Sequence, residues 1–262
     1  EGILQQSGLE RYSFNTNVSG RSENKKFTYG FSVNANYSIN DEPNNIGGSG
    51  INRNYILGAY QSVPYITADD YTTGAALLSP LSFVNTPLFL VDRLKTFTRT
   101  EREIKTIASM NFGYEIIEGL RIGSRTSMDF EQENLLSSEG PTSFNALLFR
   151  PGGAANTTPG TQDQQNRQVF TYNQLTSIKY DKTFAEKHTF NFGLYNEMFH
   201  AQLNTFGFRN NGLDPRTFSP GDGSGFVADN SANDFYSNTV NANIAESSLL
   251  SYFGTVDYDY DN

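Results

Sequence analysis

The clearest pattern in the chain is a strict alternation of apolar and polar residues from Phe27 to Ile39. The odd-numbered positions carry aromatic or aliphatic side chains, and the even-numbered positions carry small or polar ones. Because successive side chains of a strand point to opposite faces, this segment predicts a β-strand with one apolar and one polar face. It is slightly longer than the roughly 9–11 residues that a tilted transmembrane strand needs. Two structures fit it: a half-buried strand of a soluble sandwich, or a strand of an outer-membrane barrel.

The same alternation predicts six further strands, and their connections alternate between short and long. The strands are expected at residues 11–20, 104–114, 120–131, 168–180, 189–199 and 249–260. Short links lie at 21–26, 117–119 and 181–188, and long polar loops lie at 40–103, 132–167 and 200–248. Short turns at one rim and long loops at the other are typical of outer-membrane barrels, at the periplasmic and extracellular sides respectively. The loop lengths therefore favour a barrel over a soluble sandwich.

Aromatic residues near the strand ends agree with this interpretation. They are Tyr12, Tyr37, Tyr114, Phe130, Tyr180, Phe199 and Tyr260. Girdles of aromatic residues mark both interfaces of membrane barrels, although strands in general also favour Tyr and Phe. Single-chain bacterial barrels have an even number of strands, and an open sheet would expose unpaired backbone groups to lipid. Seven strands therefore predict a section of a larger barrel.

Composition excludes several other classes of protein. No run approaches 18 apolar residues, which excludes a transmembrane helix. The net charge of −9 argues against nucleic acid as a partner, because phosphate binding needs clustered Lys and Arg. The absence of cysteine excludes disulfides and thiolate metal sites. Glu1 is not a start methionine and no signal peptide follows it, so we expect the chain to be processed or a fragment.

Residues that could support catalysis or metal binding are few. His188 and His200 are the two histidines, and neither has a second histidine or a triad partner at a useful spacing. The acidic stretches Asp222–Gly225 and Asp257–Asp261 lack the ligand spacing of a Ca²⁺ loop. We therefore predict that the protein is not an enzyme and has no catalytic, cofactor-binding or metal-binding residues.

Two sets of residues are candidates for ligand or partner contacts. Four charged residues share one face of the predicted strand 120–131. Burying these charges in a dry core would cost much free energy, so we expect them to line a lumen or contact a plug. They are Arg121, Arg125, Asp129 and Glu131. Aromatic residues in the first long loop either stack on a ligand or partner, or form the small core of the loop itself. They are Tyr60, Tyr65, Tyr71, Phe83 and Phe89.

Several stretches carry a resemblance to a known family. They are RYSFNTNVSG with FTYGFSVNANYS, NFGYEIIEGLRIGSRTSMDFEQ, YDKTFAEKHTFNFGLYNEM and LLSYFGTVDYDYDN. The chain resembles the barrel of SusC-like TonB-dependent outer-membrane transporters, the SusC/RagA family of Bacteroidetes. The resemblance implies an all-β fold in which residues 1–262 form part of an antiparallel barrel of about 22 strands. An N-terminal plug, a TonB box and the other strands would lie outside this segment. The absence of Trp departs from the family's usual composition.

The resemblance also implies a function and partners. It implies TonB-dependent uptake of a large nutrient, such as an oligosaccharide or a peptide, across the bacterial outer membrane. A SusD-like surface lipoprotein, TonB and outer-membrane lipid are the implied partners. Two alternatives stay open at this point: a structural or adhesive barrel that acts as a scaffold in a surface complex, and a soluble β-sandwich binding module. The rows of Phe and Tyr on one strand face argue against the soluble module.

Overall fold

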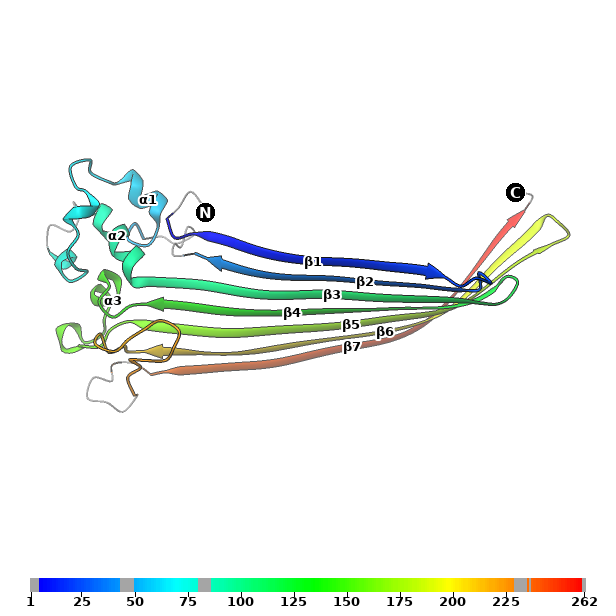
Figure 1. Ribbon diagram of the computed structural model, residues 1–262. Helices are drawn as coiled ribbons and strands as arrows, with labels where there is room; N and C mark the ends of the chain where they lie inside the picture. Colours follow the sequence, from blue (N-terminus) through cyan, green and yellow to red (C-terminus); the bar gives the residue numbers. More distant parts are fainter. Residues whose placement is uncertain (1–4, 43–49, 80–85, 229–234, 236, 261–262) are drawn as a thin grey trace.

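Seven antiparallel strands, joined in chain order, form one sheet in the computed structural model (Figure 1). The structure describes residues 5–42, 50–79, 86–228, 235 and 237–260. Within these ranges the strands are β1 Gly8–Arg21, β2 Phe27–Asp41, β3 Phe97–Ile117, β4 Leu120–Glu139, β5 Thr161–Phe184, β6 His188–Asn211 and β7 Thr239–Tyr260. Each strand pairs with its neighbours in sequence, and β1 and β7 are the two edges. The predicted number and direction of strands are confirmed.

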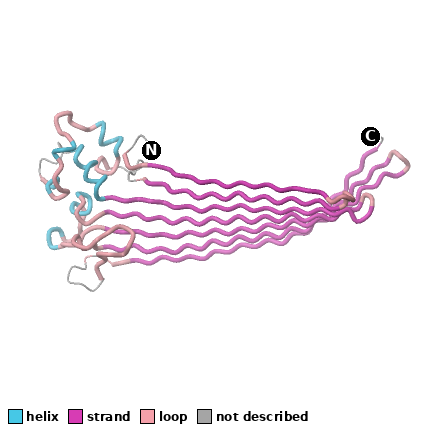
Figure 2. The backbone as a smooth tube through the Cα atoms, in the orientation of Figure 1, coloured by secondary structure: helices cyan, strands magenta, loops and turns pink. Residues whose placement is uncertain are grey.

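The two ends of the sheet differ in their connections (Figure 2). One end, the turn end, carries tight turns, and Gly119 adopts a φ of 83° in the β3–β4 turn, which glycine does at little cost. The other end, the loop end, carries the helices α1 Tyr55–Tyr60, α2 Thr86–Thr96 and α3 Phe144–Leu148. Short 3₁₀ turns lie beside them at Ala68–Asp70, Ala76–Leu78 and Gly153–Ala155. No helix in the described ranges has the length and apolarity needed to span a membrane.

The strands are longer than the alternation predicted, and the long loops are correspondingly shorter. β3 begins at Phe97 and not at Ile104, so the predicted loop 40–103 contains α2 and the start of this strand. β4 continues to Glu139, β5 begins at Thr161, β6 continues to Asn211 and β7 begins at Thr239. These added segments carry polar residues on both faces, so backbone pairing continues where the side-chain alternation has stopped.

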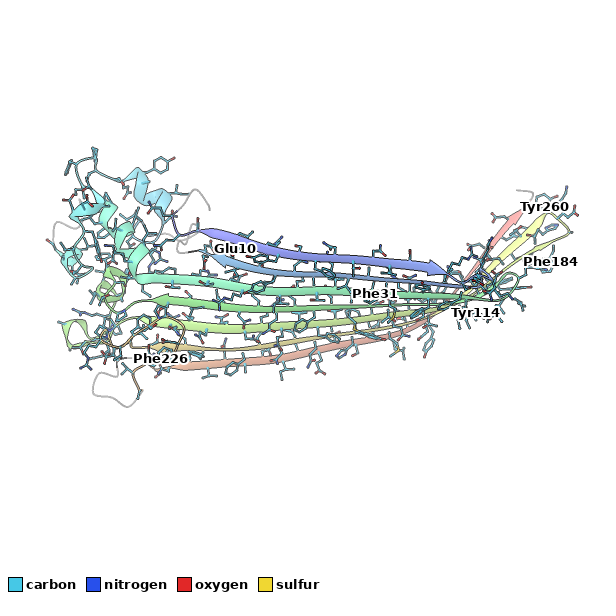
Figure 3. All side chains as sticks on the ribbon, viewed as in Figure 1. Glu10, Phe31, Tyr114, Phe184, Phe226 and Tyr260 are labelled. Carbon is cyan, nitrogen blue, oxygen red and sulfur yellow. The ribbon has the colours of Figure 1, made fainter. Side chains whose placement is uncertain are left out.

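One face of the sheet carries a continuous band of apolar side chains, called here the apolar band. Paired residues point to the same face, and the register aligns the alternate residues of Phe27–Ile39, Ile104–Tyr114, Ile122–Phe130, Phe170–Tyr180, Phe190–Met198 and Leu250–Tyr260. Figure 3 shows side chains along both faces, including Phe31 in the sheet. Phe31 is 43% exposed and Leu194 is 66% exposed, whereas the buried hydrophobic residues of the described chain all lie at the loop end. So large an exposed apolar surface predicts contact with lipid.

The apolar band crosses the strands obliquely. On β2, the band ends at Ile39 on the side of the loop end. The residues paired with Ile39 on the successive strands are Arg102, Asn134, Asn166, Phe206 and, on β7, Ala242. On β7 the band begins at Leu250, a further 8 positions along the strand from Ala242. At about 3.3 Å per residue and about 4.8 Å between strands, this slope corresponds to strands tilted by about 45° to the edge of the band. Transmembrane barrel strands are tilted by a similar angle.

The predicted aromatic girdle is wrong at one position. Tyr12, Tyr37, Tyr114, Phe130, Tyr180 and Tyr260 share the face of the apolar band. Phe199 lies on the opposite, polar face, where it pairs with Asn173 and Leu249. Its neighbour Met198 lies on the face of the apolar band, because the apolar residues of β6 on that face have even numbers.

Candidate functional site

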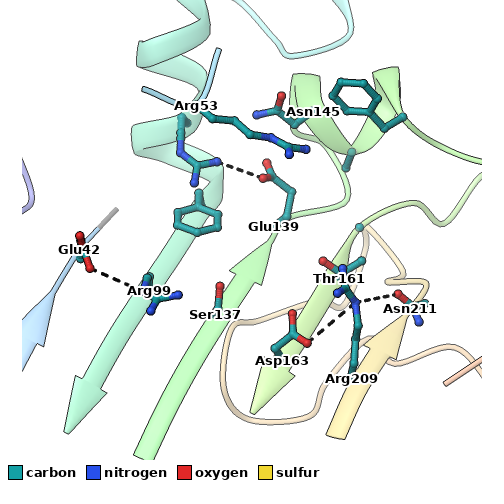
Figure 4. A pocket seen from close by; sticks show the side chains of 15 residues that line it. Glu42, Arg53, Arg99, Ser137, Glu139, Asn145, Thr161, Asp163, Arg209 and Asn211 are labelled. Atoms are coloured by element: carbon teal, nitrogen blue, oxygen red, sulfur yellow. Dashed lines mark hydrogen bonds and ion pairs between the residues drawn. The ribbon is translucent and has the colours of Figure 1, made fainter. Parts of the chain in front are cut away.

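A cavity of about 860 Å³ lies on the polar face at the loop end, called here the inner cavity (Figure 4). At the loop end of the sheet, strand residues that the register places on the polar face form the floor of the cavity. These are Arg99, Ser137, Glu139, Asp163, Arg209 and Asn211. Its roof consists of Arg53, the α2 residue Arg93, the α3 residue Asn145 and Phe149, which follows α3. The cavity therefore lies between the sheet and the folded loops.

One buried ion pair joins the roof to the floor. The Arg93 guanidinium on α2 lies 3.2 Å from the Glu139 carboxylate at the end of β4, and both side chains are largely buried. The same guanidinium lies 3.6 Å from the ring centroid of Phe97. Breaking a buried pair leaves an uncompensated charge, which typically costs about 3–5 kcal/mol. Arg93 and Glu139 therefore have a structural role in fixing α2 over the sheet.

Two further ion pairs in the cavity are looser and more exposed. Arg99 lies 3.7 Å from Glu42, and Arg209 lies 3.9 Å from Asp163. Such pairs contribute about 0–1 kcal/mol, so little free energy is lost when a ligand replaces one partner. Arg209 also donates to the Asn211 side chain at 3.3 Å. The inner cavity thus presents cationic and anionic groups that can exchange partners with a charged ligand.

A small hydrophobic core holds the roof together. It consists of Leu77, Leu88, Phe89 and Phe144, with Ile66 and Tyr71 packed against it. The rings of Phe89 and Phe144 stack at 4.3 Å. Asp92, on α2 and 1% exposed, accepts a hydrogen bond from the Tyr71 hydroxyl at 2.8 Å and another from the Phe144 backbone N–H at 2.8 Å. One carboxylate therefore connects α2, the segment around Tyr71 and the start of α3.

Burial controls the protonation of these two groups. Burial raises the pKa of Asp92, and the hydrogen bonds from Phe144 and Tyr71 only partly oppose this effect. Burial also raises the pKa of Tyr71, with a further upward contribution from the hydrogen bond to Asp92. Asp92 is therefore easier to protonate in the folded loop than in an unfolded chain.

The raised pKa of Asp92 predicts that the loop assembly is more stable in mild acid. The contribution of a group with a raised folded-state pKa is fully present below the unfolded value, here 3.8, and is lost as the pH rises through the folded value. We expect hydrogen-exchange protection of α2 and α3, corrected for intrinsic rates, to fall as the pH rises above the unfolded-state pKa of 3.8. The variant Asp92→Asn should lose this dependence. Protection that rises with pH in the unmodified protein would contradict the prediction.

The structure places the predicted loop aromatics in two different environments. Tyr71 and Phe89 belong to the roof core. Tyr60 and Tyr65 lie on the loop surface, 86% and 72% exposed. Phe83 lies outside the described residues. Of the two roles considered for this set, core formation describes Tyr71 and Phe89, and partner contact stays a prediction for Tyr60 and Tyr65.

The predicted charged residues of β4 all lie on the polar face, below the inner cavity and outside its lining. Arg121 pairs with Asp181 at 2.9 Å near the turn end. Glu131 accepts hydrogen bonds from Lys105 at 2.8 Å and from Arg167 at 2.5 Å. Arg125 and Asp129 lie between them on the same face. Their contact with a plug or a ligand stays a prediction.

The charged residues of the inner cavity were missed in the sequence because they fall in segments predicted to be loops. Arg99, Glu139, Asp163 and Arg209 lie in the parts of the strands that extend past the alternating pattern. The available signal was the alternation of faces along each strand. Arg99 is an even number of residues from Lys105, and Arg209 is an even number of residues from Glu197, and Lys105 and Glu197 lie on the polar face. Extending each strand by its parity would have assigned these arginines to the polar face.

The two histidines and Asp222 have neighbouring partners in the structure. His188 Nδ1 lies 2.8 Å from the Tyr258 hydroxyl, and His200 Nδ1 lies 2.9 Å from the Ser248 hydroxyl. Asp222 accepts from the backbone N–H of Ser224 at 2.9 Å within its own turn. In the part of the chain that the structure describes, no three His, Cys, Asp or Glu side chains converge as metal ligands.

Comparisons with known proteins give no match to a family model and none to a curated protein. Solved structures do match. The RagAB peptide transporter is 14% identical with a TM-score of 0.62, and the RagAB peptide importer is 15% identical with TM-scores of 0.68 in the "open-open" state and 0.63 in the "closed-closed" state. Each match covers 97% of this chain and 26% of the solved chain, so the chain spans about a quarter of the length of the chains it matches. The predicted resemblance is therefore confirmed at the level of the fold: the chain has the fold of a section of the barrel of a SusC-like TonB-dependent transporter.

Proposed function

We propose that the chain is a section of an outer-membrane importer that takes up peptides in a TonB-dependent manner. The observation that carries this proposal is the division of one sheet into two chemically opposite faces. The tilted apolar band suits lipid on one face, and the charged inner cavity lies on the other face at the loop end. In the full protein, residues 1–262 would form part of the barrel, and the plug and the remaining strands would lie elsewhere in the sequence. Transport would be driven through TonB, with no reaction catalysed by these residues.

The charges of the inner cavity favour a peptide over a neutral oligosaccharide. Arg99 and Arg209 can each form bidentate hydrogen bonds with a carboxylate, and Glu42 and Asp163 can bind an ammonium group. A peptide carries both kinds of charge at its ends, whereas a neutral sugar carries neither. The importer that this chain matches in fold is described as a peptide importer, which supports the same substrate class.

The exposed surfaces of this part of the barrel suggest its partners. Tyr60 and Tyr65 project from the loop surface, and aromatic residues are enriched at protein interfaces. We propose that this surface contacts a SusD-like lipoprotein that covers the loop end. The apolar band would contact outer-membrane lipid, and TonB would act on the plug from the turn end.

The proposal predicts that Arg209→Ala lowers the affinity for peptide. Loss of a charge-assisted hydrogen bond to a carboxylate typically removes about 1.5–3 kcal/mol, which is about tenfold or more in Kd. The measurement is calorimetric binding of peptides to the full-length transporter in detergent. The substitution should reduce the affinity much less for a peptide that has an amidated carboxyl terminus and no acidic side chain than for the free-acid form of the same peptide.

Arg21→Ala is a matched control for this experiment. Arg21 is also on the polar face, but it lies at the turn end, where it donates to the Lys25 carbonyl at 2.8 Å. Its removal should leave peptide affinity unchanged. Equal losses in the two variants, or unchanged affinity in Arg209→Ala, would contradict a role for the inner cavity in peptide binding.

A further inference from the structure

A second cavity, of about 580 Å³, lies on the opposite face of the sheet, the face of the apolar band. It is called here the outer groove. Its floor consists of two successive rows of outward-facing residues, of which Arg102, Asn134, Asn166 and Phe206 form the lower row. The loop segment 220–222 forms a wall. The outer groove therefore opens away from the inner cavity and toward the surroundings of the barrel.

The loop wall is attached to the sheet from two sides. The Gly221 backbone N–H donates to the Gln162 side chain at 3.1 Å, and the Gln164 side chain donates to the Gly221 carbonyl at 3.2 Å. The rings of Phe208 and Phe226 meet edge to face at 6.0 Å. The outer groove is thus a preformed site, so a ligand would not have to order its walls.

At its β3 side, the outer groove begins where the apolar band ends. On β3, Arg102 is the next outward-facing residue after Ile104, the last apolar residue of the band. A step of two residues in a strand tilted by about 45° rises by about 5 Å along the membrane normal. The headgroup layer of a bilayer is about 5–8 Å thick on each side of the hydrocarbon core. The groove therefore begins, at Arg102, at the level of lipid headgroups. Because the band is oblique, Asn134 and Asn166 lie 4 residues beyond its last apolar residues, Phe130 and Phe170, and Phe206 lies 8 residues beyond Met198. The floor of the groove thus rises to about 19 Å above the hydrocarbon core, a height that a saccharide headgroup reaches and a small phosphate headgroup does not.

The chemistry of the groove suits a sugar that carries a negative group. Asn134 and Asn166 present amide groups, linked by a hydrogen bond of 2.7 Å, and amides both donate to and accept from hydroxyl groups. Phe206 is 54% exposed and offers a flat ring to the C–H face of a pyranose. Arg102 adds a guanidinium that suits a phosphate or carboxylate. An apolar acyl chain would satisfy none of the remaining donors and acceptors of these groups.

We propose that the outer groove binds the saccharide headgroup of a glycolipid in the outer leaflet. The inference rests on the proposed placement of the barrel in the outer membrane, because continuity with the apolar band brings the headgroups of surrounding lipids to the groove. A lipid anchored beside the band presents its sugar at a high effective concentration. Binding would hold the loop wall and the lipid together at the membrane surface.

Native mass spectrometry of the full-length protein tests this proposal. The protein is delipidated in mild detergent and titrated with a short-core lipopolysaccharide, with its released core oligosaccharide, and with phosphatidylglycerol. We expect the lipopolysaccharide to bind and the released oligosaccharide to bind at least about tenfold more weakly. Asn134→Ala with Asn166→Ala, or Phe206→Ala, should lower lipopolysaccharide binding by about tenfold, while phosphatidylglycerol binding stays the same. Phe206→Tyr keeps the ring and should retain binding.

Asn15→Ala with Asn34→Ala is a matched control, because these asparagines form a similar cross-strand amide hydrogen bond on the polar face. It should leave lipopolysaccharide binding unchanged. Equal losses in the two double variants, equal binding of the free oligosaccharide, or displacement by phosphatidylglycerol would overturn the proposal. Peptide affinity is measured on the same samples. Retained peptide binding without glycolipid binding would overturn the proposal for the outer groove alone. A protein that is soluble without detergent would overturn the proposed placement in the membrane.

Discussion

Replacing Asp92 with alanine is expected to separate the segments that form the roof of the inner cavity. The Tyr71 hydroxyl and the Phe144 N–H would lose their shared acceptor inside a buried site. Each buried donor left unsatisfied costs about 1–3 kcal/mol, so the loop assembly should lose about 2–6 kcal/mol. Hydrogen exchange of peptides that cover α2 and α3 in the full-length protein measures this loss, and the exchange of the strands should change little.

Asp92→Asn is the control that separates the hydrogen bonds from the charge. The amide oxygen can still accept from the Phe144 N–H, and the amide nitrogen can donate to the Tyr71 oxygen. The loss should therefore be much smaller than in Asp92→Ala. If both variants exchange as slowly as the unmodified protein, the carboxylate does not hold the roof together.

Replacing Val33 with arginine is expected to destabilise the barrel by about 2–4 kcal/mol, the typical cost of this charge on a lipid face near the midplane. Val33 lies in the middle of the apolar band on β2, whose limits are Phe27 and Ile39. The measurement is equilibrium unfolding in urea of the full-length protein reconstituted in phospholipid vesicles.

The neighbouring residue supplies the matched control for this substitution. Asn34 lies on the polar face, one position along the same strand, so Asn34→Arg adds the same charge to the wet side of the sheet. Its effect should stay below about 1 kcal/mol. Similar destabilisation by the two arginines would mean that the two faces have similar surroundings, which a membrane barrel does not allow.

The fold could be predicted where side-chain alternation reports on the environment. Phe27 to Ile39 alternates because one face of the strand belongs to the apolar band and the other is polar, and the structure places β2 at this segment. Beyond the band both faces meet polar surroundings, so the sequence from Phe97 to Glu103 shows no alternation although it belongs to β3. Helix α2 was missed because it covers the cavity inside a segment whose punctuation by Gly, Asn and Pro indicated a loop.

The site depended on information that a single strand does not contain. Arg99 and Arg209 are distant in the sequence, and both reach the inner cavity only because the registers of β3 to β6 align the upper ends of these strands. The roof depended on a long-range contact between Asp92 and Phe144. The polar face of β4 was predictable, because parity alone assigns Arg121 to Glu131 to one side.

The opposite chemistry of the two faces limits which changes in length the chain can accept. A strand has a side-chain period of two, so inserting or deleting one residue moves every following side chain to the other face. In β5, a single deletion near Thr176 would turn Ile178 toward the polar face and Lys179 toward the face of the apolar band. Homologous proteins should therefore differ in strand length by even numbers, by paired changes in neighbouring strands, or by a bulge such as the irregularity between Glu115 and Ile117. Odd changes should accumulate in the connections at the loop end.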